Sequence, residues 1–168
     1  MKKLFVSNKD ESARMFKYDW MELFSKVHYS VPLFLYVPVV GFFLYRAFTN
    51  PELGLMAVLG LFVAGAFSWT VAEYFLHRFV FHYEPTSELG QRIHFLVHGV
   101  NHDYPNDSRR LVMPPPISLP LAFLFYFLFK FLMGPSYMEP FFAGFVAGYL
   151  CYDMLHYEIG RASCRERV

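Results

Sequence analysis

The sequence has only two cysteines, Cys151 and Cys164, and few charged residues. The cysteines form neither a disulfide framework nor a CxxC metal-binding pair, so nothing in the chain requires an oxidising compartment. Charged residues make up 17% of the chain and nearly cancel, with a formal net charge of +1, so the net charge itself indicates no class of partner. We expect no nucleic-acid partner. The sequence also lacks internal repeats, low-complexity runs and a glycine-rich phosphate loop. These absences exclude disulfide-stapled domains, repeat arrays and nucleotide-binding loops of that type.

Apolar side chains are abundant instead. Hydrophobic residues make up 55% of the chain and aromatic residues 21%, which is more than one soluble core of this length usually needs. Crossing a bilayer takes roughly 20 mostly apolar residues. Four stretches meet this requirement, at residues 31–48, 53–76, 117–133 and 137–157. The sequence therefore predicts an all-α integral membrane protein with four transmembrane helices.

The amino-terminal segment and the basic residues predict how the chain lies in the membrane. The first 29 residues are charged and mixed, without the short apolar core of a cleavable signal peptide, so we expect the chain to stay anchored. With four crossings, this segment and the loop after the second span lie on the same side. Both are rich in Lys and Arg, which favour the cytoplasmic side. We therefore expect a cap on the cytoplasmic face.

Six of the seven histidines lie where an apolar stretch meets a polar loop. One histidine in such a place is more often an interfacial residue satisfied by water. Six together predict a metal centre, because neutral imidazole is the commonest metal ligand among side chains. We interpret His28, which lies outside these clusters, as structural. The predicted ligands are His77, His82, His94, His98, His102 and His156.

The spacing of these histidines supports one shared site in the cytoplasmic cap. His94, His98 and His102 are four residues apart, so a helix would place them on one face. His77 and His82 are five apart, which separates them by about 140° in a regular helix. A helix end or a π-bulge would bring these two together.

Two carboxylates are candidates for orienting the imidazole rings. Glu73 lies near the end of the second predicted span, and Asp153 lies three residues before His156. A carboxylate that accepts a hydrogen bond from one ring nitrogen fixes the tautomer and leaves the other nitrogen for a metal. Each residue has an alternative interpretation as an ordinary buried hydrogen-bonding group.

The histidine segments resemble a known family. The runs LHRFVFH, HFLVHGVNHDYPNDSRRLVMPP and YDMLHY are similar to the fatty acid hydroxylase and sterol desaturase superfamily of membrane non-haem diiron oxygenases. The nearest branch acts on the acyl chains of sphingolipids. The resemblance implies that the six histidines bind two iron ions, which zinc could replace in preparations. It also implies O₂ as co-substrate, a fatty acyl lipid as substrate, and an external electron donor of ferredoxin or cytochrome type.

The chain departs from the family pattern at two places. Asn101, in HGVNH, occupies a position that is normally histidine, and an amide is a poor substitute for imidazole on iron or zinc, so one metal could be weakened. After Tyr157 the expected further histidine clusters are replaced by a polar tail that resembles a translated sequencing adapter. We therefore expect a hydroxylase-like domain at residues 1–157, a non-native segment at residues 158–168, and an inactive chain.

Three alternatives stay open at the level of sequence. The first is a sterol or carotenoid desaturase or hydroxylase of the same superfamily. The second is a non-catalytic metal-binding or metal-transporting membrane protein, although transport needs ligands near the middle of the bilayer, and these lie at span ends. The third is a protein that holds haem between two histidines.

Overall fold

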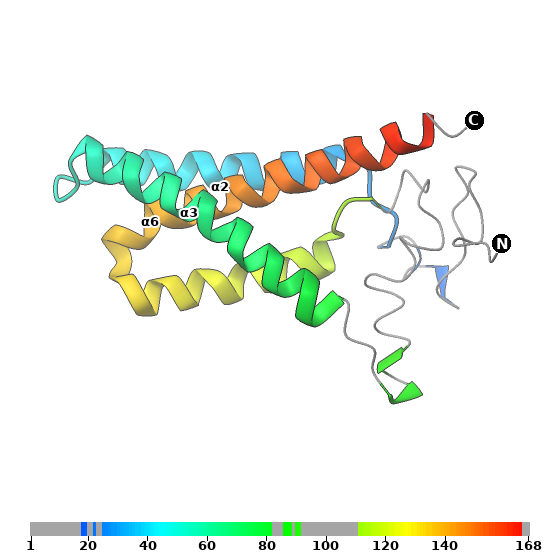
Figure 1. Cartoon of the computed structure of the whole chain (residues 1–168). Coiled ribbons are helices and arrows are strands. Elements are labelled where there is room, and N and C mark those ends of the chain that lie inside the picture. Colours follow the sequence, from blue (N-terminus) through cyan, green and yellow to red (C-terminus); the bar gives the residue numbers. More distant parts are fainter. Residues whose placement is uncertain are drawn as a thin grey trace. The chain divides into compact units, whose positions relative to one another are not determined.

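The computed structural model describes residues 18, 19, 22, 25–81, 86–88, 90, 91 and 111–165. The main elements in this part of the chain are all helical, as predicted (Figure 1). They are α2 (Ser30–Thr49), α3 (Leu55–Leu76), the π-helix η1 (His77–Phe81) and α6 (Pro115–Arg165). The chain divides into two compact units. The helical-bundle unit comprises Ser30–Ala72 and Pro115–Tyr152, and the histidine-bearing unit comprises Met1–Tyr29, Glu73–Pro114 and Asp153–Val168.

Three described helices are long and apolar enough to cross a membrane. They cover Ser30–Thr49, Leu55–Phe79 and Pro115–Ile159. The first two confirm the predicted membrane-type helices at residues 31–48 and 53–76. The third takes in both of the remaining predicted spans, because α6 consists of two helices merged across a kink. The number of crossings therefore stays a prediction.

Gly134 makes the kink in α6. Its φ of 75° and ψ of 167° are not helical, and they lie in a region that side chains with a Cβ rarely adopt. Pro135 follows directly and cannot continue the hydrogen bonds of the preceding helix. Figure 1 shows α6 turning back on itself here, so that its two arms form a helical hairpin.

Glycines let the second arm of α6 pack directly on α3. A Cβ added to Gly144 would lie 1.9 Å from the backbone oxygen of Phe62, and one added to Gly65 would lie 2.0 Å from the backbone oxygen of Phe141. At Gly148, four residues after Gly144, the nearest atom would be 2.9 Å away. This GxxxG spacing is typical of closely packed membrane helices, in which small residues let the two backbones approach.

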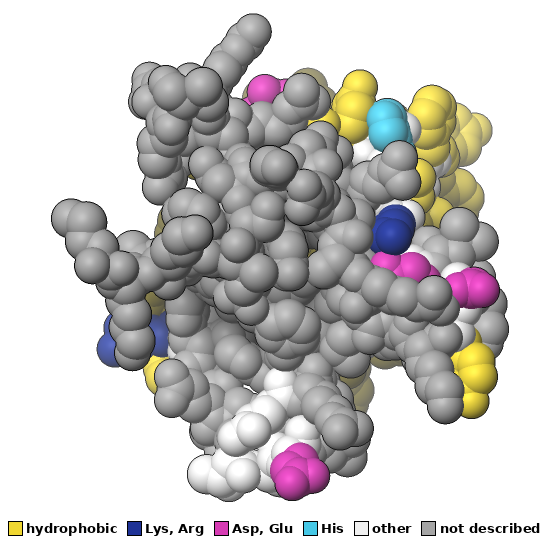
Figure 2. Space-filling view, turned by 90° about the vertical axis from the view of Figure 1, so that its right-hand side faces the viewer, with side chains coloured by type: hydrophobic (Ala, Val, Ile, Leu, Met, Phe, Trp, Pro, Cys, Tyr) yellow, Lys and Arg dark blue, Asp and Glu magenta, His cyan; other side chains and the backbone are white. Residues whose placement is uncertain are grey.

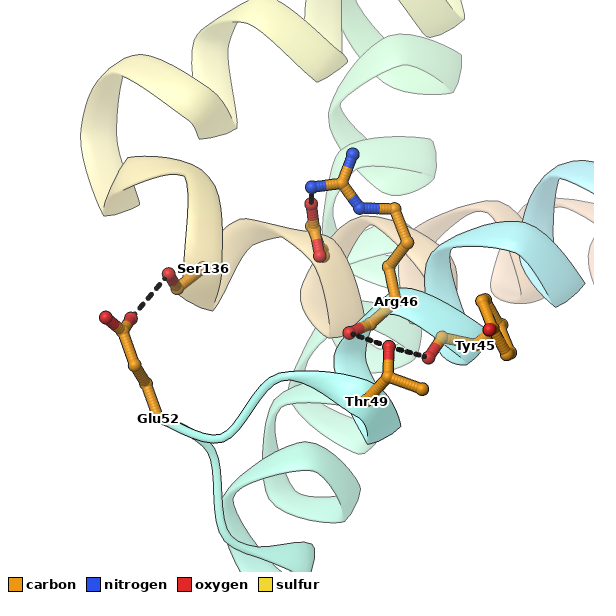
Figure 3. A network of polar contacts seen from close by, with 6 residues as sticks. Tyr45, Arg46, Thr49, Glu52 and Ser136 are labelled. Carbon is orange, nitrogen blue, oxygen red and sulfur yellow. Dashed lines mark hydrogen bonds and ion pairs between the residues drawn. The ribbon is translucent and has the colours of Figure 1, made fainter.

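Polar contacts join α2 and the following loop to the start of the second arm of α6 (Figure 3). The guanidinium of Arg46 pairs with the Glu139 carboxylate at 2.8 Å. Ser136 donates a hydrogen bond to Glu52 at 2.8 Å. Deeper in the same unit, the buried hydroxyl of Tyr36 donates to Ser118 at 2.8 Å. These three contacts attach α2 and the loop after it to α6 within the helical-bundle unit.

The two partners of the Arg46–Glu139 pair are unequally buried, so removing one is not equivalent to removing the other. The side chain of Glu139 is 6% exposed and that of Arg46 is 53% exposed. We expect Arg46→Gln to cost roughly 3 kcal/mol, because it leaves a buried carboxylate without its cation. Glu139→Gln should cost about 1 kcal/mol or less, because a half-exposed guanidinium keeps its water. Thermal unfolding in detergent measures both variants, and equal losses would contradict the prediction.

Candidate metal centre

The structure describes two of the six predicted ligands. His77 is half-buried at the start of η1, and His156 is exposed on α6. His82, His94, His98 and His102 lie outside the described residues, as does Asn101. Within the described part of the chain, no group of three or more His, Cys, Asp or Glu residues could hold a metal. The ligand set therefore stays a prediction.

The π-helix η1 matches the predicted departure from α-helical geometry at the first histidine motif. It begins at His77 and ends at Phe81, directly after α3. Hydrogen bonds in a π-helix join residues five apart, and such turns are frequent at functional sites. Residues five apart therefore come closer to one face than they do in an α-helix, which is what the His77–His82 spacing requires. The position of His82 itself lies outside the described residues.

Glu73 lies next to the imidazole of His77. The residue is only 8% exposed, and its Oε1 atom is 3.7 Å from Nδ1 of His77, one helical turn further along. This distance is longer than a good hydrogen bond. Carboxylates that orient metal-binding imidazoles accept a hydrogen bond from one ring nitrogen and leave the other for the metal. Glu73 and His77 are therefore neighbouring side chains of the right chemical types, and the predicted orienting hydrogen bond stays a prediction.

Asp153 contacts the backbone of the segment that follows the predicted histidine loop. It is 4% exposed, and its Oδ1 atom accepts a hydrogen bond from the backbone N–H of Met113 at 3.2 Å. The predicted contact between Asp153 and an imidazole stays a prediction. The observed bond ties the end of this segment to α6 one turn before His156.

A small hydrophobic cluster reinforces this attachment. It was not predicted, although the apolar run LVM within a polar segment was a signal for it. Leu111 and Val112, which are 6% and 3% exposed, pack with Val27 and Tyr157, and Met154 lies against them. Burial of a large apolar side chain stabilises by about 1.5–3 kcal/mol. The cluster thus fixes the start of residues 111–114 on the last part of α6.

The role of Asp153 in this attachment can be tested by two substitutions. Asp153→Ala leaves the partly buried N–H of Met113 without its acceptor, which we expect to cost about 1 kcal/mol. Asp153→Asn keeps an oxygen at Oδ1 and should retain most of the stability. Hydrogen exchange at the Met113 amide measures the effect directly. Equal protection in Asp153→Ala and in the unchanged protein would contradict the assignment.

The described side chains near the amino terminus agree with a structural role for His28. Its exposed ring lies 4.3 Å from that of Tyr29, which stacks on Tyr157 with ring centroids 4.9 Å apart. Figure 2 shows hydrophobic side chains gathered near one edge of one face of the molecule. We therefore keep His28 as a control position outside the predicted metal centre.

Comparison with known proteins agrees with the resemblance in the histidine motifs. The fatty acid hydroxylase family matches residues 62–167. Fatty acid 2-hydroxylase from Mus musculus is 41% identical over 165 residues, covering 86% of this chain and 44% of the relative. A dihydroceramide fatty acyl 2-hydroxylase from Arabidopsis thaliana is 37% identical over 153 residues, covering 90% of this chain and 64% of the relative.

A solved structure is similar in fold. It is described as full-length Scs7p with only the hydroxylase domain visible, and it is 37% identical with a TM-score of 0.79. The match covers 84% of this chain and 54% of that one. The chain thus spans between 44% and 64% of the length of these three relatives.

Proposed function

Because this chain belongs to the fatty acid hydroxylase family, we propose that it comes from a membrane enzyme that uses O₂ to hydroxylate the fatty acyl chain of a lipid. The observation that carries the proposal is the 37–41% identity to fatty acid and dihydroceramide fatty acyl 2-hydroxylases over most of the chain. The membrane-type helices support it, since such substrates lie in the bilayer. A sphingolipid acyl chain is the substrate class that these relatives favour over a sterol or carotenoid.

The proposed metal ligands are the six histidines at span ends and in the loop between spans. A pair of iron ions, when bound, would supply the O₂ activation that no side chain can provide. Glu73 would orient the His77 imidazole, and Asp153 would hold the end of the loop segment near His156. Zinc has similar ligand preferences and could occupy the site in preparations. The full proposed set is His77, His82, His94, His98, His102 and His156.

We propose four crossings, with the two arms of α6 as the third and fourth. The Gly134 kink supports this arrangement, because it lets two apolar arms run in opposite directions. The histidine-bearing unit would then lie on the cytoplasmic side, which the basic residues of its segments favour. Lipid would reach the site from the bilayer, and an external ferredoxin or cytochrome would supply electrons.

Asn101 favours a second candidate, a metal-binding membrane protein with weakened or lost catalysis. A carbonyl oxygen binds iron or zinc less well than an imidazole nitrogen, so one of the two metals would be held less tightly. The expectations that residues 158–168 are non-native and that this chain alone is inactive stay predictions. An assay of hydroxylated lipid distinguishes the two candidates.

The proposed activity is tested by expressing the native reading frame in cells without 2-hydroxylated sphingolipids. Lipid mass spectrometry should detect acyl chains with one added oxygen, and His98→Ala should abolish them. Residues 1–168 expressed alone should give no such product. Unchanged lipids with the native frame, despite normal protein levels, would contradict the hydroxylase proposal.

A further inference from the structure

A basic side chain framed by aromatic rings lies at the end of α3 and the start of η1. We call Tyr74, Phe75, Arg78 and Phe79 the aromatic–arginine patch. The three rings are 54%, 53% and 59% exposed in this order, and Arg78 is exposed as well. All four residues belong to the histidine-bearing unit. The patch therefore presents one cation and three large rings to its surroundings.

The guanidinium of Arg78 is held in place by its neighbours. It donates a hydrogen bond to the Tyr74 hydroxyl at 2.6 Å. Its central carbon lies 5.9 Å from the centre of the Tyr74 ring and 5.7 Å from that of Phe79. Phe79 in turn stacks on Phe75, with ring centroids 5.8 Å apart and an angle of 16° between the planes. An arginine held in this way loses less side-chain entropy when it binds a ligand.

The patch lies at the end of a candidate membrane-spanning helix. This candidate span, which contains α3, runs from Leu55 to Phe79, so Arg78 and Phe79 are its last residues. Aromatic side chains gather at this level in membrane proteins, and arginine there reaches the polar headgroups. Within the described residues, the Tyr74 hydroxyl is the one hydrogen-bond acceptor of Arg78, which has five N–H donors in all.

We propose that the aromatic–arginine patch binds the phosphate of an anionic phospholipid in the surrounding bilayer. The planar guanidinium matches two phosphate oxygens, and the exposed rings pack against the upper part of the acyl chains. A basic residue near an anionic surface gains binding energy that a zwitterionic lipid does not provide to the same extent. None of its four residues is a proposed metal ligand, although Arg78 directly follows the proposed ligand His77.

The test measures binding of a phosphatidic acid to the purified protein in detergent, with phosphatidylcholine as the neutral comparison. Native mass spectrometry counts the bound lipids at increasing concentration. We expect phosphatidic acid to bind more tightly, and Arg78→Gln to raise its apparent Kd about fivefold. Arg78→Lys keeps the charge without the planar fork, so it should give an intermediate value. Tyr74→Phe removes the hydroxyl that holds Arg78 and should weaken binding by a smaller factor.

Lys130→Gln is the matched control. Lys130 is also an exposed cation over an aromatic ring, 5.9 Å from the centre of Tyr126, but among the described residues this is the one ring that frames it. Its substitution removes the same charge and should leave binding of phosphatidic acid unchanged. Equal binding of the two lipids to the unchanged protein would overturn the proposal. An equal loss in Lys130→Gln and Arg78→Gln would also overturn it, since net charge alone would then explain the binding.

Discussion

Gly144→Ala is expected to destabilise the helical-bundle unit by roughly 2–3 kcal/mol, although it adds only one methyl group. The new Cβ would lie 1.9 Å from the backbone oxygen of Phe62, 2.7 Å from its carbonyl carbon and 2.9 Å from its Cα. Side chains can move aside by rotation, but these atoms belong to the backbone of α3. Accommodating the methyl group therefore requires α3 and α6 to separate, which loses packing along the GxxxG contact.

The control for this prediction lies on the facing helix. Gly60 has no atom within 4 Å of its would-be Cβ, so Gly60→Ala should be neutral or stabilising by up to about 1 kcal/mol through better helix propensity. Gly148→Ala should fall between the two, because its closest atoms lie at 2.9 Å rather than at 1.9 Å. Thermal unfolding in detergent gives the order. Similar melting points for Gly144→Ala and Gly60→Ala would contradict the packing described above.

The second large effect concerns metal binding by the native protein. We expect His98→Ala to remove stoichiometric metal, because it deletes a proposed ligand from the central histidine motif. Glu73→Gln should weaken metal binding by about 10–100-fold, since it alters a residue that orients His77 without being a ligand itself. The metal content of the dialysed protein, measured by inductively coupled plasma mass spectrometry, tests both predictions.

His28→Ala is the control for these substitutions. It removes an exposed imidazole that contacts Tyr29 and lies outside the proposed ligand set, so metal content should not change. Equal metal loss in His28→Ala and His98→Ala would indicate surface binding rather than a defined centre. Full metal retention in Glu73→Gln would show that the Glu73–His77 contact has no orienting role.

The apolar helices could be predicted from the sequence because a membrane span depends on the length and hydropathy of one continuous stretch. A helix end or a π-bulge at His77 was expected only on the condition that His77 and His82 share a site, and the π-helix η1 agrees with the second of these alternatives. The kink at Gly134 divides α6 into two helices, and it lies between the two apolar stretches that were predicted as separate spans.

Contacts between distant segments could not be predicted in the same way. The hydrogen bond between Asp153 and the amide of Met113 joins residues 40 positions apart. The hydropathy of the two segments gives no indication that they are in contact. The same holds for Gly144 against Phe62, where GxxxG indicates close packing but not the partner helix. The pairing of Arg46 with Glu139 likewise depends on how α6 turns back at Gly134.

The most direct test of the dimetal proposal is the number of metal ions per purified chain of the native reading frame, measured with and without Asn101→His. We predict close to two irons or zincs per chain in the native protein. A gain only in Asn101→His would indicate a site that has lost one ligand. The absence of stoichiometric metal from both proteins would contradict the dimetal proposal.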